Sequence, residues 1–311
     1  MNLFTNKPSI IQEAEKAKFK PHFMIQLLIF VAVFFIAQIG ATIPLIVAIV
    51  RKLLLTEGGI DQNTLTEYTT NLPQDIMIVS LFSTLIATIL TIVYCRFIER
   101  RSLHSIGFVK KKGVSDYFLG LLIGLILFSF SVLIAYLTGS VEFNGLNSNI
   151  PYGIILLFLI AFLIQGMSEE VILRGYLMVS LSTKIPVIAA ILINSLIFSV
   201  LHFTNPGASP LAAFNIALFG IFASIFALKS DSLWGVCGIH SAWNFVQGNF
   251  FGFKVSGLDT SSSILSFTSS EAGSLFNGGA FGMEGGLGVT ITLAIGILIV
   301  LVIKGKNSQS A

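Results

Sequence analysis

The sequence predicts an all-α, polytopic membrane protein: a helical bundle of about eight transmembrane helices with both termini cytoplasmic. Three observations lead to this prediction. The 311 residues are 54% hydrophobic and only 11% charged, with a mean hydropathy of +0.89, whereas soluble domains carry about 25% charged residues. The apolar residues form long runs, and a helix needs about 20 such residues to cross a bilayer. The basic residues lie mostly in one set of the loops between these runs.

Eight apolar runs are predicted to form the transmembrane helices, at residues 23–50, 76–95, 116–138, 151–180, 185–203, 209–228, 231–252 and 286–303. The first run is too long to be the core of a signal peptide. Gln38, Gly40 and Pro44 within it indicate a tilted or kinked helix. Cys95 and Cys237 lie in separate runs without redox or metal-ligand spacing, so both are interpreted as packing residues.

The loop charges set the predicted orientation. With the N-terminus in the cytoplasm, the outer side holds three basic residues, Arg51, Lys52 and Lys254. The inner side then holds fourteen, as the positive-inside rule requires: Lys7, Lys16, Lys18, Lys20, Arg96, Arg100, Arg101, Lys110, Lys111, Lys112, Lys184, Lys229, Lys304 and Lys306. Because these residues flank membrane spans, orientation explains them, and no nucleic-acid partner is expected.

The runs and loops divide the chain into five segments. They are a cytoplasmic N-terminal segment (1–22), three transmembrane helices (23–145), a core of four helices (146–253), an outer loop (254–285), and a final transmembrane helix with a cytoplasmic tail (286–311). The outer loop 254–285 is rich in Ser and Gly, and this composition favours a mobile loop over a functional one. A second long outer loop, 51–75, carries acidic residues.

Charged residues inside the run 151–180 mark the candidate site. Each charge at the centre of a membrane helix costs about 2.5–3.5 kcal/mol on insertion scales, so such charges usually mark function. Glu170 and Arg174 are four residues apart and can pair on one face of a helix. Glu169 is rotated from Glu170 by about 100°, so it cannot share that pairing equally and points elsewhere.

Two histidines and an asparagine are expected to reach the depth of Glu169. At about 1.5 Å per residue, Glu169 lies ~20 Å and His202 ~24 Å from the inner turn between their helices. From the next inner turn, His240 lies ~14 Å and Asn244 ~20 Å away. His240 and Asn244 are also four residues apart and share a helix face. Polar groups from three helices are therefore predicted to converge.

Three motifs follow one another on these apolar helices: Glu169-Glu170-x-x-x-Arg174, Phe198-x-x-x-His202 and His240-x-x-x-Asn244. Together they resemble the motifs of the CAAX-protease and bacteriocin-processing family of intramembrane proteases, which includes the type II CAAX prenyl endopeptidases. The resemblance covers about residues 150–250 and would make segment 146–253 the protease core. It implies a multi-pass protein of the cell membrane that cleaves a peptide bond in a small membrane-associated or lipidated protein or peptide.

The resemblance also implies catalytic roles. Glu169 would act with His202 to polarise a water molecule, and His240 and Asn244 would stabilise the oxyanion. A carboxylate held in a cavity can serve as a general base, and an asparagine amide or a histidine ring nitrogen can donate to an oxyanion.

Three further motif residues are expected to support the site. Glu170 and Arg174 would hold the geometry of the helix that carries Glu169. Phe198 lies one turn before His202 and is expected to pack beside it.

The same residues could instead bind a metal ion. Glu169, His202 and His240 could form a two-histidine, one-carboxylate zinc site. The metal-free mechanism is favoured, because no carboxylate is evident as a partner for both histidines. No cofactor is certain, and zinc is the possible one.

Two other functions fit part of the pattern. A non-catalytic scaffold for bacteriocin self-immunity or for regulating a sensor could keep the motifs for structure. An ion or proton transporter could use buried Glu and His as a relay, but the chain has no internal repeat. Asn194 and Asn215 fit any of these functions or simply link helices. The substrate stays open: prenylated CAAX proteins, peptide pheromones and bacteriocin precursors all fit a cavity that opens toward the cytoplasmic leaflet.

Overall fold

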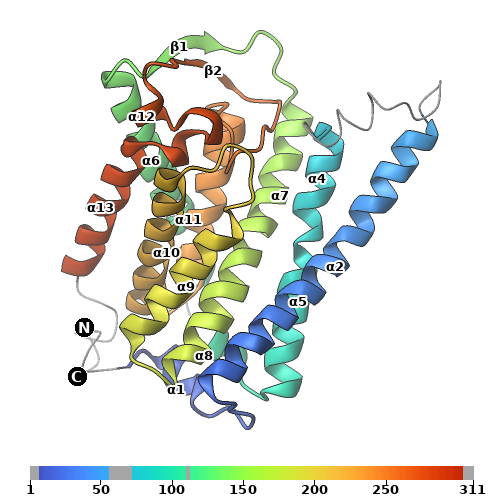
Figure 1. The fold of residues 1–311 in the computed structure, drawn as a ribbon, viewed down its shortest axis with the longest axis vertical. Helices are drawn as coiled ribbons and strands as arrows, with labels where there is room; N and C mark the ends of the chain where they lie inside the picture. The colour runs from blue at the N-terminus through green and yellow to red at the C-terminus, as the bar shows by residue number, and fades with distance from the viewer. Residues whose placement is uncertain (1–6, 56–71, 110–112, 304–311) are drawn as a thin grey trace.

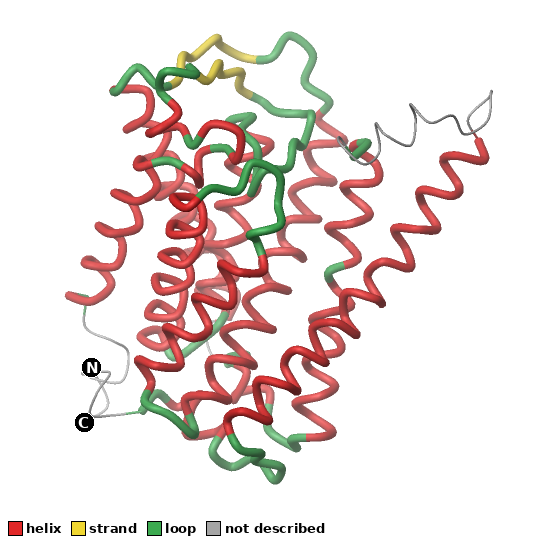
Figure 2. The backbone as a smooth tube through the Cα atoms, in the orientation of Figure 1, coloured by secondary structure: helices red, strands yellow, loops and turns green. Residues whose placement is uncertain are grey.

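The computed structural model describes residues 7–55, 72–109 and 113–303. It shows a bundle of long helices with a two-stranded sheet at one end (Figures 1 and 2). The predicted helical bundle is confirmed, and a small two-stranded sheet that the sequence did not predict is added to it. Strands β1 (Val141–Leu146) and β2 (Leu265–Ser269) pair antiparallel. Both strands lie in segments that the hydropathy pattern treated as loops, and part of their pairing is a cross-strand contact between two phenylalanine rings.

The helices follow one another along the chain as α1 (Ser9–Ala14), α2 (Phe23–Leu55), α4 (Gln74–Ser83), α5 (Leu85–Val93), α6 (Gly113–Leu137), α7 (Tyr152–Glu170), α8 (Val179–Ser182), α9 (Val187–Leu201), α10 (Pro210–Ser230), α11 (Trp234–Phe245), α12 (Ser274–Asn277) and α13 (Leu287–Val302). Three π-helical stretches continue helices: η1 (Tyr94–Ile98), η3 (Val171–Met178) and η4 (Val246–Phe250). Three short 3₁₀ turns complete the described part of the chain: η2 (Leu103–Ile106), η5 (Gly279–Phe281) and η6 (Met283–Gly285).

Within the described residues, five helical segments are long and apolar enough to cross a membrane: Phe23–Leu55, Gln74–Ile98, Gly113–Leu137, Tyr152–Ser182 and Pro210–Ser230. Helices α9 and α13 are apolar but shorter. The chain is thus a multi-pass helical membrane protein, and each of the eight predicted runs contains a helix. Eight crossings and cytoplasmic termini stay predictions. Parts of the predicted loop 51–75, residues 110–112 and the tail after 303 lie outside the described residues.

The first and second predicted spans are irregular. Helix α2 keeps Pro44 within it and leans away from the bundle toward the end that carries the sheet (Figure 1). The second span breaks at Thr84, between α4 and α5. The Ser168 hydroxyl of α7 donates to the carbonyl of Thr84 at 2.7 Å. This bond satisfies a carbonyl at the break and ties the second span to the turn of α7 that carries Glu169.

Close packing fixes the position of α11, which carries two of the predicted site residues. A Cβ atom added at Gly120 or Gly124 of α6 would come within 2.0 and 2.4 Å of carbonyl oxygens of α11. A Cβ at Gly166 of α7 would come within 2.7 Å of the Ser241 nitrogen on α11. Small residues let membrane helices approach closely, so α11 is held tightly between α6 and α7.

The segment 254–285, expected to be a mobile loop, is folded. It contains β2, α12 and two 3₁₀ turns, and its Phe281 and Met283 are buried in the main core. Gly278 and Gly282 have positive φ angles, and a Cβ at either would come within 2.4 Å of a backbone oxygen. The glycines of this segment therefore permit tight turns, a role that composition does not distinguish from flexibility.

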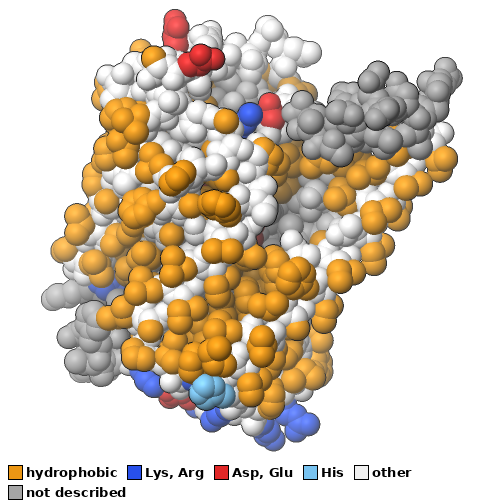
Figure 3. Space-filling view, viewed as in Figure 1, with side chains coloured by type: hydrophobic (Ala, Val, Ile, Leu, Met, Phe, Trp, Pro, Cys, Tyr) orange, Lys and Arg blue, Asp and Glu red, His pale blue; other side chains and the backbone are white. Residues whose placement is uncertain are grey.

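The predicted orientation can be tested at the two ends of the bundle. Lys and Arg side chains gather near α1, away from the sheet (Figure 3). We expect Glu271→Cys, near the sheet, to react with a membrane-impermeant maleimide in intact cells, and Lys18→Cys to react only after permeabilisation. The two native cysteines are buried and give little background. Labelling of Lys18→Cys in intact cells would show that the orientation is inverted.

Candidate active site

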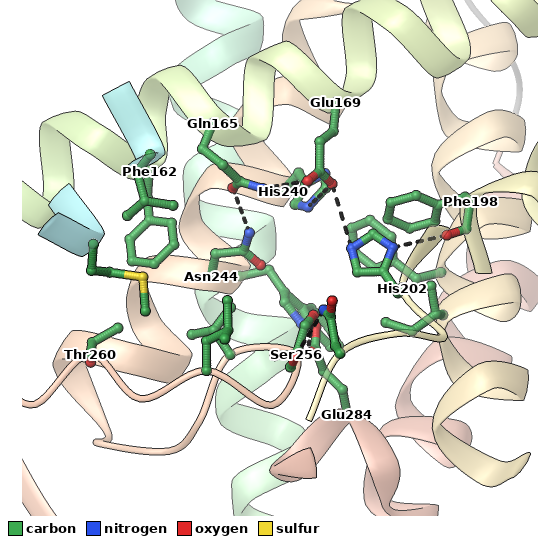
Figure 4. A pocket seen from close by; sticks show the side chains of 18 residues that line it. Phe162, Gln165, Glu169, Phe198, His202, His240, Asn244, Ser256, Thr260 and Glu284 are labelled. Atoms are coloured by element: carbon green, nitrogen blue, oxygen red, sulfur yellow. Dashed lines mark hydrogen bonds and ion pairs between the residues drawn. The ribbon is translucent and has the colours of Figure 1, made fainter. Parts of the chain in front are cut away.

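The predicted catalytic residues line one pocket of about 120 Å³ (Figure 4). Its walls come from α4, α7, the end of α9, α10, α11 and the folded segment 254–285. Glu169, Phe198, His202, His240 and Asn244 all face it. The predicted convergence of polar groups from three helices is therefore confirmed, while their catalytic roles stay predictions.

The pocket lies in the half of the bundle that carries the sheet. On α7 its lining begins at Glu169 and continues toward the end near the sheet, at Gln165 and Phe162. On the other side of Glu169, the fully buried Glu170 and Arg174 close it toward α1. Under the predicted orientation this half faces outward. The expected cavity that opens toward the cytoplasmic leaflet is therefore incompatible with the expected cytoplasmic N-terminus. With a cytoplasmic N-terminus, the pocket lies in the outer half of the membrane.

Glu169 is the most accessible of the acidic and histidine side chains at the centre of the pocket, with 27% of its side chain exposed. Its Oε2 atom is buried and accepts no hydrogen bond from the described residues. The Nε2 atoms of His240 and His202 lie 3.6 and 4.0 Å from this oxygen. The other oxygen, Oε1, accepts a hydrogen bond from Gln165 at 2.6 Å. One carboxylate oxygen is thus fixed, and the other faces two imidazoles.

His202 was predicted inside a span that reaches residue 203, but α9 ends at Leu201 and His202 caps it. The helix stops shortly before Gly207, whose φ of +75° no helix accommodates. The Nδ1 atom of His202 lies 2.9 Å from the carbonyl oxygen of Phe198. Because a carbonyl only accepts, Nδ1 carries the hydrogen. The Nε2 lone pair therefore points toward Glu169.

A carboxylate of the neighbouring helix α7 holds His240 in place. Its Nδ1 lies 2.8 Å from Oε1 of Glu170, and its ring packs against the ring of Phe219, with centroids 5.0 Å apart. This contact orients Nε2 toward Glu169 and the pocket. The sequence predicted Glu170 only as the partner of Arg174, because a contact between two helices leaves no spacing in the sequence.

The predicted pair of Glu170 and Arg174 is confirmed. The two side chains are fully buried, and Arg174 Nη1 donates to Glu170 Oε1 at 2.9 Å. The guanidinium lies over the ring of Phe198, 4.5 Å from its centroid, and the Phe198 ring also packs edge-on against His202. Arg174 sits in the π-helical stretch η3, and such stretches are frequent at functional sites.

Gln165 connects two of the predicted catalytic residues. It accepts a hydrogen bond from Asn244 Nδ2 at 2.8 Å and donates one to Glu169 at 2.6 Å. The sequence analysis gave it no role. Its position, four residues before Glu169, is the signal that could have identified it, since residues at this spacing share a helix face.

Three residues that no motif predicts complete the pocket on the side of the sheet: Asn205, Ser256 and Glu284. The Asn205 amide donates to the carbonyl of Ser256 at 3.0 Å. The Glu284 carboxylate accepts hydrogen bonds from Trp243 of α11 and from Ser256. No spacing relates these residues to the three motifs, because the folding of segment 254–285 brings them together.

The two asparagines with open roles link elements. Asn194 donates to Ser224 and so joins α9 to α10. Asn215 donates to the carbonyls of Glu284 and Gly286, where α13 begins. Neither lines the pocket, so both fit the interhelical role that polar side chains often have in membranes.

The fit of a metal ion can be judged from the donor atoms. Across residues 7–55, 72–109 and 113–303, no group of three or more His, Cys, Asp or Glu side chains is arranged to hold a metal ion. Zinc needs ligand atoms at about 2.0–2.2 Å from one point. Glu169, His202 and His240 are not such a group, and the mechanism proposed for this chain uses no metal.

Residues 151–246 match the family model described as Type II CAAX prenyl endopeptidase Rce1-like. The match contains all three motifs and confirms the predicted resemblance over this segment. It leaves out Ser256 and Glu284. No curated protein and no solved structure matches the chain.

Proposed function

We propose that the chain, given the family match over residues 151–246, is an intramembrane endopeptidase. It would hydrolyse a peptide bond in a small membrane-associated or lipidated protein or peptide at the cell membrane. One observation carries the proposal. Oε2 of Glu169 is buried, accepts no hydrogen bond from the described residues, and faces the Nε2 atoms of two histidines in a pocket.

A water molecule among these three atoms is the nucleophile in this mechanism. Glu169 Oε2 accepts one proton of the water, while the lone pair of His202 Nε2 accepts a hydrogen bond from the other. The oxygen then forms a bond to the carbonyl carbon of the substrate. Glu169 returns its proton to the leaving nitrogen as the C–N bond breaks. General-base activation of this kind contributes about 10²–10⁴-fold to a rate.

Asn244 and His240 are placed to stabilise the oxyanion of the tetrahedral intermediate. Asn244 Nδ2 carries two hydrogens; one is donated to Gln165, and the second remains for substrate. His240 donates through Nδ1 to Glu170 and presents Nε2 to the pocket, so in this mechanism it stabilises the oxyanion as an imidazolium, with a hydrogen on both ring nitrogens. Preorganised donors are effective because they need no reorganisation as the charge develops.

One wall of the pocket is apolar, and this wall is an argument for a peptide substrate. Met77 and Leu81 of α4 and Phe162 of α7 line it, and Phe162 lies across the cavity from His202 (Figure 4). Binding sites combine such apolar walls with a few convergent polar groups. An apolar side chain next to the cleaved bond would pack against this wall.

Comparative peptidomics separates the protease from a non-catalytic scaffold. Membrane peptides are compared between cells that hold the natural chain and cells that hold Glu169→Gln at equal abundance. We expect a precursor to accumulate and its cleavage products to disappear with Glu169→Gln. Glu271→Gln, which changes an exposed carboxylate near the sheet, should leave the profile unchanged. Identical profiles together with a retained cellular phenotype would support the scaffold and overturn the protease.

A further inference from the structure

The charges that line the pocket are predominantly negative. Of the eighteen residues that line it in the described structure, two are carboxylates, Glu169 and Glu284, two are histidines, and none is Lys or Arg. Arg174 lies below the pocket and is paired with Glu170. Lys254 belongs to the adjoining segment, but its side chain is exposed and does not line the pocket.

Glu284 is a buried carboxylate without a cation. Only 6% of the residue is exposed, and no Lys, Arg or His of the described residues forms an ion pair with it. Buried charges are normally paired, so this exception requires an explanation. A charge that lines a pocket and has no partner in the protein is suited to a partner that arrives with the ligand.

The hydrogen bonds of Glu284 fix its position. Oε1 accepts from Trp243 Nε1 at 3.2 Å, and Oε2 accepts from the backbone nitrogen and the hydroxyl of Ser256 at 2.7 and 2.8 Å. All three partners can donate, so the carboxylate needs no proton of its own. All three are also neutral, so they orient the negative charge without cancelling it.

We infer that the pocket is a subsite for a cationic group of a peptide, either a basic side chain or a free amino terminus, and that Glu284 selects it. The inference rests on the proposed function only in treating the pocket as a peptide site. A free C-terminal carboxylate, which a CAAX motif carries, would meet two carboxylates and no Lys or Arg here. Peptides with a cationic group near the cleaved bond are therefore favoured over peptides that end beside it.

Binding of matched peptides tests the inference without requiring cleavage. The full-length Glu169→Gln chain is purified into nanodiscs of zwitterionic lipid, so that Glu284 is the one carboxylate among the described lining residues. Fluorescent, N-acetylated peptides share one apolar sequence and carry Lys, Gln or Glu at one position that is scanned along it. At the best position we expect the Lys peptide to bind at least about tenfold more tightly than the Gln peptide, and the Glu peptide more weakly than both. A Gln peptide with a free amino terminus shows whether that group can replace the lysine.

Three variants of the same chain assign the preference to Glu284. Adding Glu284→Gln should abolish the advantage of Lys over Gln. Adding Ser256→Ala removes one of the hydrogen bonds that position Glu284 but keeps the charge, so the advantage should shrink without disappearing. Glu271→Gln removes an exposed carboxylate and should also leave it. If Glu284→Gln fails to fold, the three peptides on the Glu169→Gln chain still decide.

The results separate this inference from the proposed function. Equal binding of the Lys and Gln peptides, or a preference that survives Glu284→Gln, overturns the cationic subsite. Cleavage by the natural chain without a charge preference would leave the endopeptidase standing and remove the subsite. Charge-selective binding without any cleavage would support the cationic subsite and remove the endopeptidase.

Discussion

Replacing Glu169 with Gln is expected to lower the cleavage rate by about 10²–10⁴-fold while the protein stays folded. Gln has the size of Glu and keeps an oxygen that can accept the hydrogen bond from Gln165. It cannot accept a proton from the water of the proposed mechanism. The loss should therefore appear in kcat, measured on the purified protein with a substrate found by peptidomics, and the thermal transition should change little.

A second variant and a matched control test the same role of Glu169. His202→Ala should lower the rate comparably, and the double variant should cost little more than either change alone, since residues that act as a unit are not additive. His104, whose ring contacts Ser9 near α1 and lies outside the pocket, is the control, and His104→Ala should cleave normally. Undiminished cleavage by Glu169→Gln would remove Glu169 as the base.

Replacing Arg174 with Ala is expected to destabilise the protein by about 3–5 kcal/mol, because it leaves the fully buried Glu170 without its counter-charge. The change also removes the cation that lies over the Phe198 ring. Since Glu170 holds His240, activity should fall with the loss of folded protein. The measurements are abundance in the membrane and the thermal unfolding midpoint after purification.

A compensating change tests the electrostatic cause of this effect. Adding Glu170→Gln to Arg174→Ala removes the uncompensated charge and keeps an oxygen for the His240 contact, so part of the lost stability should return. Arg96→Ala removes an exposed cation and should be nearly neutral. Normal abundance and an unchanged midpoint for Arg174→Ala would contradict the buried pair.

The sequence by itself determined the class of protein and the motif residues that meet in the pocket. Apolar runs of membrane length predicted helices because lipid offers no partners to backbone amides. The i, i+4 spacing predicted the Glu170–Arg174 pair, since the helix period places such residues together. The constant rise of a helix then brought Glu169, His202 and His240 to a common depth. Each of these inferences needed only the regular geometry of single helices.

Only the tertiary structure decided how the cluster is held and what surrounds it. The Glu170 contact that orients His240 joins residues 70 apart in the chain. Glu284 reaches Trp243 across 41 positions and Ser256 across 28. The period of a helix does not relate residues that are this far apart in the sequence. The folding of segment 254–285 creates the two Glu284 contacts, through glycine turns whose composition alone suggested a mobile loop. The position of Glu284 in the pocket therefore follows from long-range packing, which local spacing in the sequence does not encode.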